Sequence, residues 1–231
     1  MRAGLVLSCE HATFALPPGL DLGLGPEVLA SHHGWDAGAL DLARALAGTQ
    51  RAPLIEAEVS RLVIDLNRSA AKAVPQENFG LPIPGNLHLR PEEIERRLER
   101  YHRPYRAAVR DAARAQAPCL HLSLHSFSKV LDGRTRAVEV GVLFDPARPA
   151  EARASEGLLR ALRAQGWDAR PNDPYLGIDD GLTTWLRPQL PDGSYAGIEI
   201  ELSQSLDPAR RADLARDLDA ALSQVRKDWP G

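Results

Sequence analysis

The segment Cys119-Leu120-His121-Leu122-Ser123-Leu124-His125-Ser126-Phe127-Ser128 alternates between apolar and polar side chains over its first half. Its three leucines share one face and His121, Ser123 and His125 share the other, a period of two that is typical of a β-strand. The alternation stops at His125, which we therefore expect at the carboxyl end of the strand. Ligands in open α/β sheets bind at that end. A hydrogen-bonded surface residue is the ordinary alternative for one such histidine, so its role depends on the rest of the chain.

Predicted strands and helices alternate along the rest of the chain. Further strands are predicted at residues 4–9, 53–59, 61–66, 138–144 and 197–202. Helices are predicted at residues 36–48, 92–116 (kinked at Pro104), 150–165 and 207–227, and irregular stretches at residues 13–25, 69–90 and 181–190. This alternation predicts an α/β fold in which helices cover both faces of a central sheet, as a single domain over residues 1–231.

The composition excludes several classes of protein. A formal net charge of -3 gives no basic surface for nucleic acid or an anionic membrane. Cys9 and Cys119 are too few and too far apart for a disulfide scaffold or a CxxC metal site. The first apolar run is too short for a signal peptide, and no run reaches the length of a membrane span. We therefore expect a cytoplasmic protein that binds neither nucleic acid nor a membrane.

Polar residues follow or flank several predicted strands. Glu10 and His11 come after the first strand, Asp36 lies at a helix start, and His125 ends the central strand. If those strands are parallel neighbours, the two histidines converge, and two imidazoles with one carboxylate make a catalytic zinc site with an open position. The alternatives are a helix N-cap for Asp36, a loop position for His11, and a solvent-facing or arginine-paired carboxylate for Glu10.

Two carboxylates share the polar face of the last predicted strand. Glu199 lies between Ile198 and Ile200, so it is partly desolvated and needs a partner or a function. A metallohydrolase needs a general base near the reacting water, and Glu199 fits that role. Glu201 is the competing candidate because it lies on the same face.

Arginines bracket the strand predicted at residues 61–66. Arg61 begins that segment, and Asn67 and Arg68 follow it. An exposed arginine is usually only solvated, but an Asn-Arg pair at a strand end can hold a substrate carboxylate through a bidentate contact.

Six segments taken together resemble the N-formylglutamate amidohydrolase family, and more narrowly its branch of predicted amidohydrolases. They are Ser8-Cys9-Glu10-His11-Ala12, His32-His33-Gly34-Trp35-Asp36-Ala37-Gly38-Ala39, Ser60-Arg61-Leu62-Val63-Ile64-Asp65-Leu66-Asn67-Arg68, Tyr101-His102-Arg103-Pro104-Tyr105, His125-Ser126-Phe127 and Ile198-Glu199-Ile200. The resemblance covers nearly the whole chain. It implies a zinc-dependent amide hydrolase with a three-layer α/β/α fold similar to the zinc carboxypeptidases, in which a mixed sheet lies between helices.

The resemblance also implies roles for individual residues. His11, Asp36 and His125 match the metal positions, for one zinc ion per chain, and Glu199 matches the base. Asn67 and Arg68 resemble the pair that holds the substrate's α-carboxylate. Apart from the resemblance, we expect an arginine such as Arg61 or Arg68 to polarise the amide carbonyl. The roles of Glu10, His32 and Glu201 stay open. The chain departs from the better-characterised branch, which has Pro-His-Ser-Gly where this sequence has Glu10-His11-Ala12-Thr13, and it has Lys129 where relatives often have proline.

The expected reaction is hydrolysis of the amide bond of a small N-acyl amino acid, such as N-formylglutamate, by a metal-bound water. One alternative is a non-catalytic protein that keeps the pocket and binds a metal or small molecule. A serine hydrolase that uses Ser123 or Ser126 is disfavoured because no Gly-x-Ser-x-Gly segment occurs. A nucleotide-binding protein is disfavoured because residues 19–25 lack the required glycine spacing. The sequence leaves open the acyl group, the amino acid, the physiological metal and the oligomeric state.

Overall fold

A computed structural model describes residues 2–131 and 133–229, and its centre is a six-stranded sheet in the order β2-β1-β5-β10-β8-β9. The strands are β1 (Gly4–Cys9), β2 (Leu54–Glu56), β5 (Cys119–Phe127), β8 (Val140–Leu143), β9 (Ala169–Pro171) and β10 (Tyr195–Ser203). Neighbouring strands run parallel except β10 and β8, which are antiparallel. The predicted α/β fold with a mixed central sheet is therefore confirmed.

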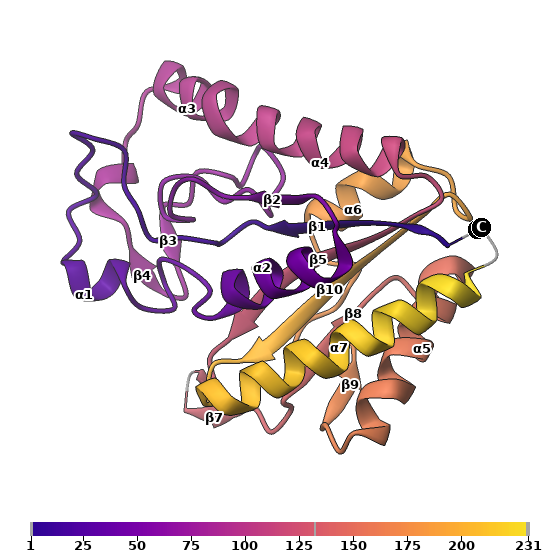
Figure 1. The fold of residues 1–231 in the computed structure, drawn as a ribbon. Helices are drawn as coiled ribbons and strands as arrows, with labels where there is room; N and C mark the ends of the chain where they lie inside the picture. The colour runs from indigo at the N-terminus through magenta and orange to yellow at the C-terminus, as the bar shows by residue number, and fades with distance from the viewer. Residues whose placement is uncertain (1, 132, 230–231) are drawn as a thin grey trace.

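Helices form a layer on each face of this sheet (Figure 1). On one face lie α2 (Ala39–Gln50), α5 (Pro149–Ala164) and α7 (Pro208–Asp228). The other face is covered by α3 (Pro91–Arg97), the π-helix η2 (Leu98–His102), α4 (Arg103–Ala115) and α6 (Leu182–Leu186). The smaller elements are α1 (Pro26–Leu29), η1 (Pro84–Asn86), η3 (Arg187–Gln189), and two short hairpins, β3 (Glu77–Asn78) with β4 (Leu81–Pro82) and β6 (Val130–Leu131) with β7 (Arg134–Thr135).

The central strand β5 is buried along its whole length, so its polar face is buried too. Parallel pairing with β10 sets Ser123 beside Glu199 and His125 beside Glu201. Side chains of paired residues lie on the same face of a sheet. The polar residues of β5 and β10 therefore form one continuous polar layer, which lies beneath α4 and α6.

The prediction of a strand at residues 61–66 is wrong. The segment forms successive turns, in which the Ser60 carbonyl accepts hydrogen bonds from the backbone N–H groups of Val63 and Ile64. Leu62, Val63 and Ile64 are buried all the same. A short buried apolar run looks the same in sequence whether it is a strand or a turn, because burial and not backbone conformation sets its composition.

Two further predictions need correction. Residues 181–190 were predicted to be irregular, but they contain α6 and η3, which are too short for a helical period to be visible. Asp36 is not the N-cap of α2; that position is Gly38, whose φ of 85° lies in the left-handed region that favours glycine. This turn leaves the Asp36 side chain free to point elsewhere.

Other boundaries follow the sequence closely. Asp207 caps α7 by accepting the Arg210 N–H, and Pro208 is the first helical residue, as predicted. The helix predicted at residues 92–116 is present as α3, η2 and α4 in succession. The π-helical turn ends at His102, two residues before Pro104, which has no N–H to donate to the preceding turn.

Candidate active site

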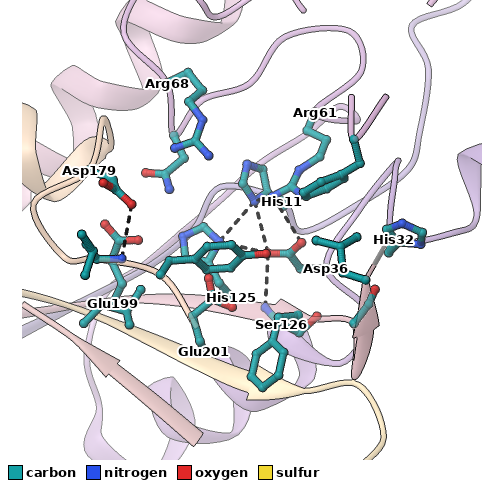
Figure 2. Close-up of a pocket in the computed structure, with 18 of the residues that line it drawn as sticks. His11, His32, Asp36, Arg61, Arg68, His125, Ser126, Asp179, Glu199 and Glu201 are labelled. Atoms are coloured by element: carbon teal, nitrogen blue, oxygen red, sulfur yellow. Dashed lines mark hydrogen bonds and ion pairs between the residues drawn. The ribbon is translucent and has the colours of Figure 1, made fainter. Parts of the chain in front are cut away.

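His11, Asp36 and His125 converge at one edge of the sheet (Figure 2). His11 lies just beyond β1 and His125 lies near the carboxyl end of β5, and the two strands are parallel neighbours. Nδ1 of His125 lies 3.0 Å from Asp36 Oδ2 and 3.2 Å from Nδ1 of His11, which is itself 3.2 Å from Asp36 Oδ2. The predicted convergence of the two histidines is therefore present, and Asp36 joins them.

These three residues form a possible metal site. All three are buried, and no other group of this kind was found among the residues that the structure describes. Ligand atoms on a tetrahedral zinc ion lie about 3.3 Å apart, close to the three separations observed. Two imidazole nitrogens that face one another and a carboxylate suit a shared cation better than they suit hydrogen bonding alone. The chemistry of the donor set thus fits a divalent metal.

Each histidine has a carboxylate at its other ring nitrogen. Asp65 Oδ1 lies 2.8 Å from His11 Nε2, and Glu10 Oε2 lies 3.0 Å from His125 Nε2. Burial alone would raise the pKa of Glu10, but hydrogen bonds and the charge of His125 outweigh it and lower that pKa to about 2. Carboxylates in such positions fix the orientation of metal-binding histidines. Asp65 was not predicted as a site residue, although it is the single polar residue in the apolar run at residues 62–66.

The cluster lies in a cleft of ≈ 740 Å³, a volume that includes its open mouth. The residues singled out from the sequence that line it are His11, His32, Asp36, Arg61, Asn67, Arg68, His125, Ser126, Glu199 and Glu201. Glu10 is fully buried behind His125 and does not reach the cleft. His32 lies at the side of the cleft against His33, with ring centroids 4.2 Å apart, and is not part of the cluster.

The side chains of Arg61 and Arg68 lie above the cluster (Figure 2). An Nη2 group of Arg61 contacts Nδ1 of His11 and lies 3.3 Å from Asp36 Oδ1. Arg68 is exposed and donates to the Asp180 carbonyl, whereas Asn67 is buried and accepts the Leu182 N–H at 2.7 Å. Arg61 therefore faces the cluster itself, and Arg68 faces the cleft from an adjoining wall.

The two carboxylates of β10 differ in their surroundings. Glu199 Oε1 accepts a hydrogen bond from Thr183 Oγ1 at 2.7 Å. Glu201 lies beside His125, and its buried Oε2 has no hydrogen-bond partner in the part of the chain that the structure describes. Burial raises the pKa of Glu201 to about 8; the Asp36 and Glu199 carboxylates add to this rise, and His125 and Arg61 oppose it.

The serines of β5 do not form a nucleophilic site. Ser123 lies 2.8 Å from His125 Nε2, but it is fully buried, donates its proton to Glu10 and does not line the cleft. Ser126 lines the cleft, but its Oγ accepts from the Gln204 side chain at 3.0 Å. Neither arrangement supplies an accessible serine activated by a histidine.

Two further residues of the cleft carried no signal in the sequence. Arg136 donates to the Tyr175 hydroxyl at 2.9 Å, and its guanidinium lies 4.9 Å from the centroid of that ring. Both come from irregular segments, where no period marks which side chains face inward.

Comparison with known proteins gives three findings. The model of the N-formylglutamate amidohydrolase family matches residues 3–206. No curated protein matches the sequence significantly. Two solved structures are similar over nearly their whole length: a gene product from Agrobacterium tumefaciens (32% identity, TM-score 0.86, covering 97% of this chain and 91% of that one) and an N-formylglutamate amidohydrolase from Ralstonia eutropha (23% identity, TM-score 0.78, covering 99% and 94%).

Proposed function

The chain belongs to the N-formylglutamate amidohydrolase family, and on that premise we propose that it is a zinc-dependent amidohydrolase acting on a small N-acyl amino acid. N-formyl amino acids such as N-formylglutamate are the first substrates to consider, and a cytoplasmic location is part of the proposal. The observation that carries it is the convergence of two imidazole nitrogens and a carboxylate within 3.2 Å of one another, inside a cleft that also holds Arg61 and Arg68.

The metal would be held by His11, Asp36 and His125. Two imidazoles and one carboxylate are a known ligand set of catalytic zinc, which supports zinc as the metal and one ion per chain. When bound, the ion would supply the Lewis acidity that polarises an amide carbonyl and makes water more acidic.

The arginines and Asn67 give the substrate its orientation. Arg68 is exposed to the cleft and forms no ion pair within the described residues, so its guanidinium is available to the α-carboxylate of an amino acid. Asn67 adjoins it and supports the same end of the substrate. Arg61, which lies against the cluster, would donate to the amide carbonyl oxygen as negative charge develops there.

The general base is one of the two carboxylates of β10. The resemblance implies Glu199, but the contacts support Glu201 better, because it lies beside His125 and has an oxygen with no partner among the described residues. Glu201 would take a proton from the attacking water, whose oxygen bonds to the carbonyl carbon. It would then pass that proton to the amide nitrogen as the C–N bond breaks, which yields the free acid and the free amino acid.

A screen of N-formyl, N-acetyl and N-formimino amino acids tests the proposal. Protein stripped with a chelator and reloaded with zinc is expected to release free amino acid from at least one of them, and the stripped protein is not. His125→Ala should lose most of its zinc and its activity, since a two-ligand remnant binds metal poorly. His32→Ala is the matched control because it lines the same cleft outside the cluster.

The same screen distinguishes the proposed amidohydrolase from the main alternative, a non-catalytic binding protein. Stoichiometric zinc without hydrolysis of any N-acyl amino acid would favour a non-catalytic binding protein. Full zinc occupancy in His125→Ala would remove that residue from the ligand set.

A further inference from the structure

We propose that Glu10 is a positioning residue for the metal site: its buried carboxylate holds Nε2 of His125, so that Nδ1 of the same ring faces His11 and Asp36. The inference rests on the proposed function, since it assigns a second layer of contacts to the same metal site. It concerns a residue that does not line the cleft and that the sequence analysis left without a role.

The two nitrogens of His125 lie in different surroundings. Nδ1 is within 3.2 Å of both Asp36 Oδ2 and His11 Nδ1, whereas Nε2 lies 3.0 Å from Glu10 Oε2 and 2.8 Å from Ser123 Oγ. The Ser123 hydroxyl donates to Glu10, so both groups near Nε2 are able to accept a proton from the ring. A neutral imidazole carries one proton, and these acceptors place it on Nε2. The lone pair of Nδ1 is then directed at the cluster.

Glu10 itself is held from two sides. Its Oε1 lies 2.9 Å from the Tyr105 hydroxyl of α4, and its Oε2 contacts Ser123 and His125 of β5. The Tyr105 hydroxyl also accepts the Cys9 N–H at 3.2 Å, which ties α4 to the end of β1. A buried carboxylate is costly unless such partners satisfy it, so this one is fixed in place by contacts from two elements. A rigid acceptor restricts the rotation of the His125 ring.

The orientation matters because ring rotation would exchange the two nitrogens. A metal ligand must present an unprotonated nitrogen, and a carboxylate at the opposite nitrogen both selects that tautomer and raises the basicity of the ligand. Asp65 makes the equivalent contact to His11, at 2.8 Å. The ligand set is thus supported by a carboxylate behind each histidine.

Zinc affinity is the test, measured by competition with a chromophoric chelator and without substrate. Glu10→Gln keeps the size of the side chain but removes its charge and replaces one of its two acceptor oxygens with a donor, and we expect zinc to bind about 10- to 100-fold more weakly. Glu56→Gln is the matched control: Glu56 ends the neighbouring strand, opposite Cys9, but it is partly exposed and paired with Arg44. Its zinc affinity should equal that of the wild type.

A second readout separates positioning from a merely structural role. If Glu10 only supports the fold, Glu10→Gln lowers the melting temperature of the metal-free protein and leaves the zinc affinity of the folded fraction unchanged. That result would overturn the inference. Ser123→Ala serves if Glu10→Gln does not fold; removing the hydroxyl that holds Oε2 should weaken zinc binding several-fold, and an unchanged affinity would count equally against the inference.

The outcomes also distinguish this inference from the proposed function. Wild-type protein that binds zinc and hydrolyses an N-acyl amino acid, with Glu10→Gln binding zinc equally tightly, would leave the function standing and remove the role of Glu10. Wild-type protein that binds no zinc would remove both.

Discussion

Glu199 and Glu201 of β10 are the two candidates for the general base, and each assignment predicts a different effect of mutation on turnover. Glu199→Gln and Glu201→Gln are the same chemical change, made two residues apart on the polar face of β10. Each variant keeps the size of the side chain and removes its ability to accept a proton. If Glu201 is the base, its variant should keep zinc and the fold but lose turnover, and Glu199→Gln should be much milder.

The magnitudes follow from the contacts of each carboxylate. Same-face neighbours on a strand have Cα atoms about 6.6 Å apart, and the two carboxylates have different contacts, so we expect only one of them to serve the water directly. Loss of a general base costs about 10²- to 10⁴-fold in turnover, which corresponds to roughly 3 to 5 kcal/mol in the barrier. Glu199→Gln perturbs chiefly the hydrogen bond from Thr183, which is worth about 1 kcal/mol, so its effect should stay within about tenfold.

The assay is steady-state release of free amino acid by zinc-loaded protein, with the zinc content of each variant measured in parallel. The pH dependence adds a second check. A base must be unprotonated, so activity should fall as the pH drops through the pKa of Glu201. Burial places that pKa at about 8, and positive charge held by His11, Asp36 and His125 would lower it, so the acidic limb of the wild type should lie below pH 8. Glu201→Gln should lack that limb.

The reverse result would refute the argument from contacts. A loss of 100-fold or more in Glu199→Gln, with Glu201→Gln close to wild type, would identify Glu199 as the base, as the family resemblance implies. Loss of zinc from either variant would make that carboxylate a ligand, and the mechanism would have to be redrawn.

Three other perturbations test separate parts of the structure. Arg68→Lys should raise KM about tenfold because a point charge cannot replace a bidentate contact, and substrates with an amidated α-carboxylate should lose as much; equal turnover of acid and amide would contradict this. Arg106→Lys should raise KM several-fold with little change in kcat, because Arg106 donates to the backbone carbonyls of Leu66 and Arg68 and so supports the substrate-binding segment; an unchanged KM would remove that role. Burial lowers the pKa of His121 to about 4, so it stays neutral in the folded protein while the unfolded chain takes up a proton below about pH 6.5. The contribution of His121 to the stability of the metal-free protein should therefore fall by about 3 kcal/mol between pH 6.5 and pH 4, while the raised pKa of Glu201 acts in the opposite direction. The measurement is the difference between the wild type and His121→Gln in urea unfolding at the two pH values, and a pH-independent difference would contradict the prediction.

Much of the fold could be predicted because its strands are marked by composition. The buried strands β1, β5 and β10 coincide with the predicted segments, and the parallel pairing of β1 with β5 brings His11 to His125. The segment at residues 61–66 could not be assigned in this way, since its apolar residues are buried in turns. Because the segment was assigned to a strand, the neighbours expected for Asp65 were wrong. In the observed turns its carboxylate lies against His11.

The two roles considered for Asp36 differ by a small change in the backbone. An aspartate just before a helix usually accepts the N–H groups of the first turn. Here Gly38 takes the N-cap position in a left-handed conformation, and the Asp36 carboxylate accepts the Ser126 N–H at 3.2 Å and faces both histidines. The glycine is visible in the sequence, but the position of β5 relative to Asp36 is not. The contact between Asp36 and Ser126 of β5 therefore decides between the helix-cap role and the metal-site role.

Apolar and polar side chains alternate along β5 and β10, although neither strand has a face open to water. A strand covered by helices on both faces usually reads as a continuous apolar run, whereas alternation normally marks a face open to water. Both strands here alternate although both are buried along their whole length, so their polar residues must be satisfied inside the protein. His121 pairs with Ser8 and Tyr195, Ser123 with Glu10, and Glu199 with Thr183. Among the described side chains of β5 and β10, Glu201 Oε2 is the buried polar atom left without a partner. A buried carboxylate oxygen is costly to leave unpaired, and Glu201 lies beside a proposed metal ligand in the cleft. That combination argues that its partner is a water or a substrate group, which is what a general base requires.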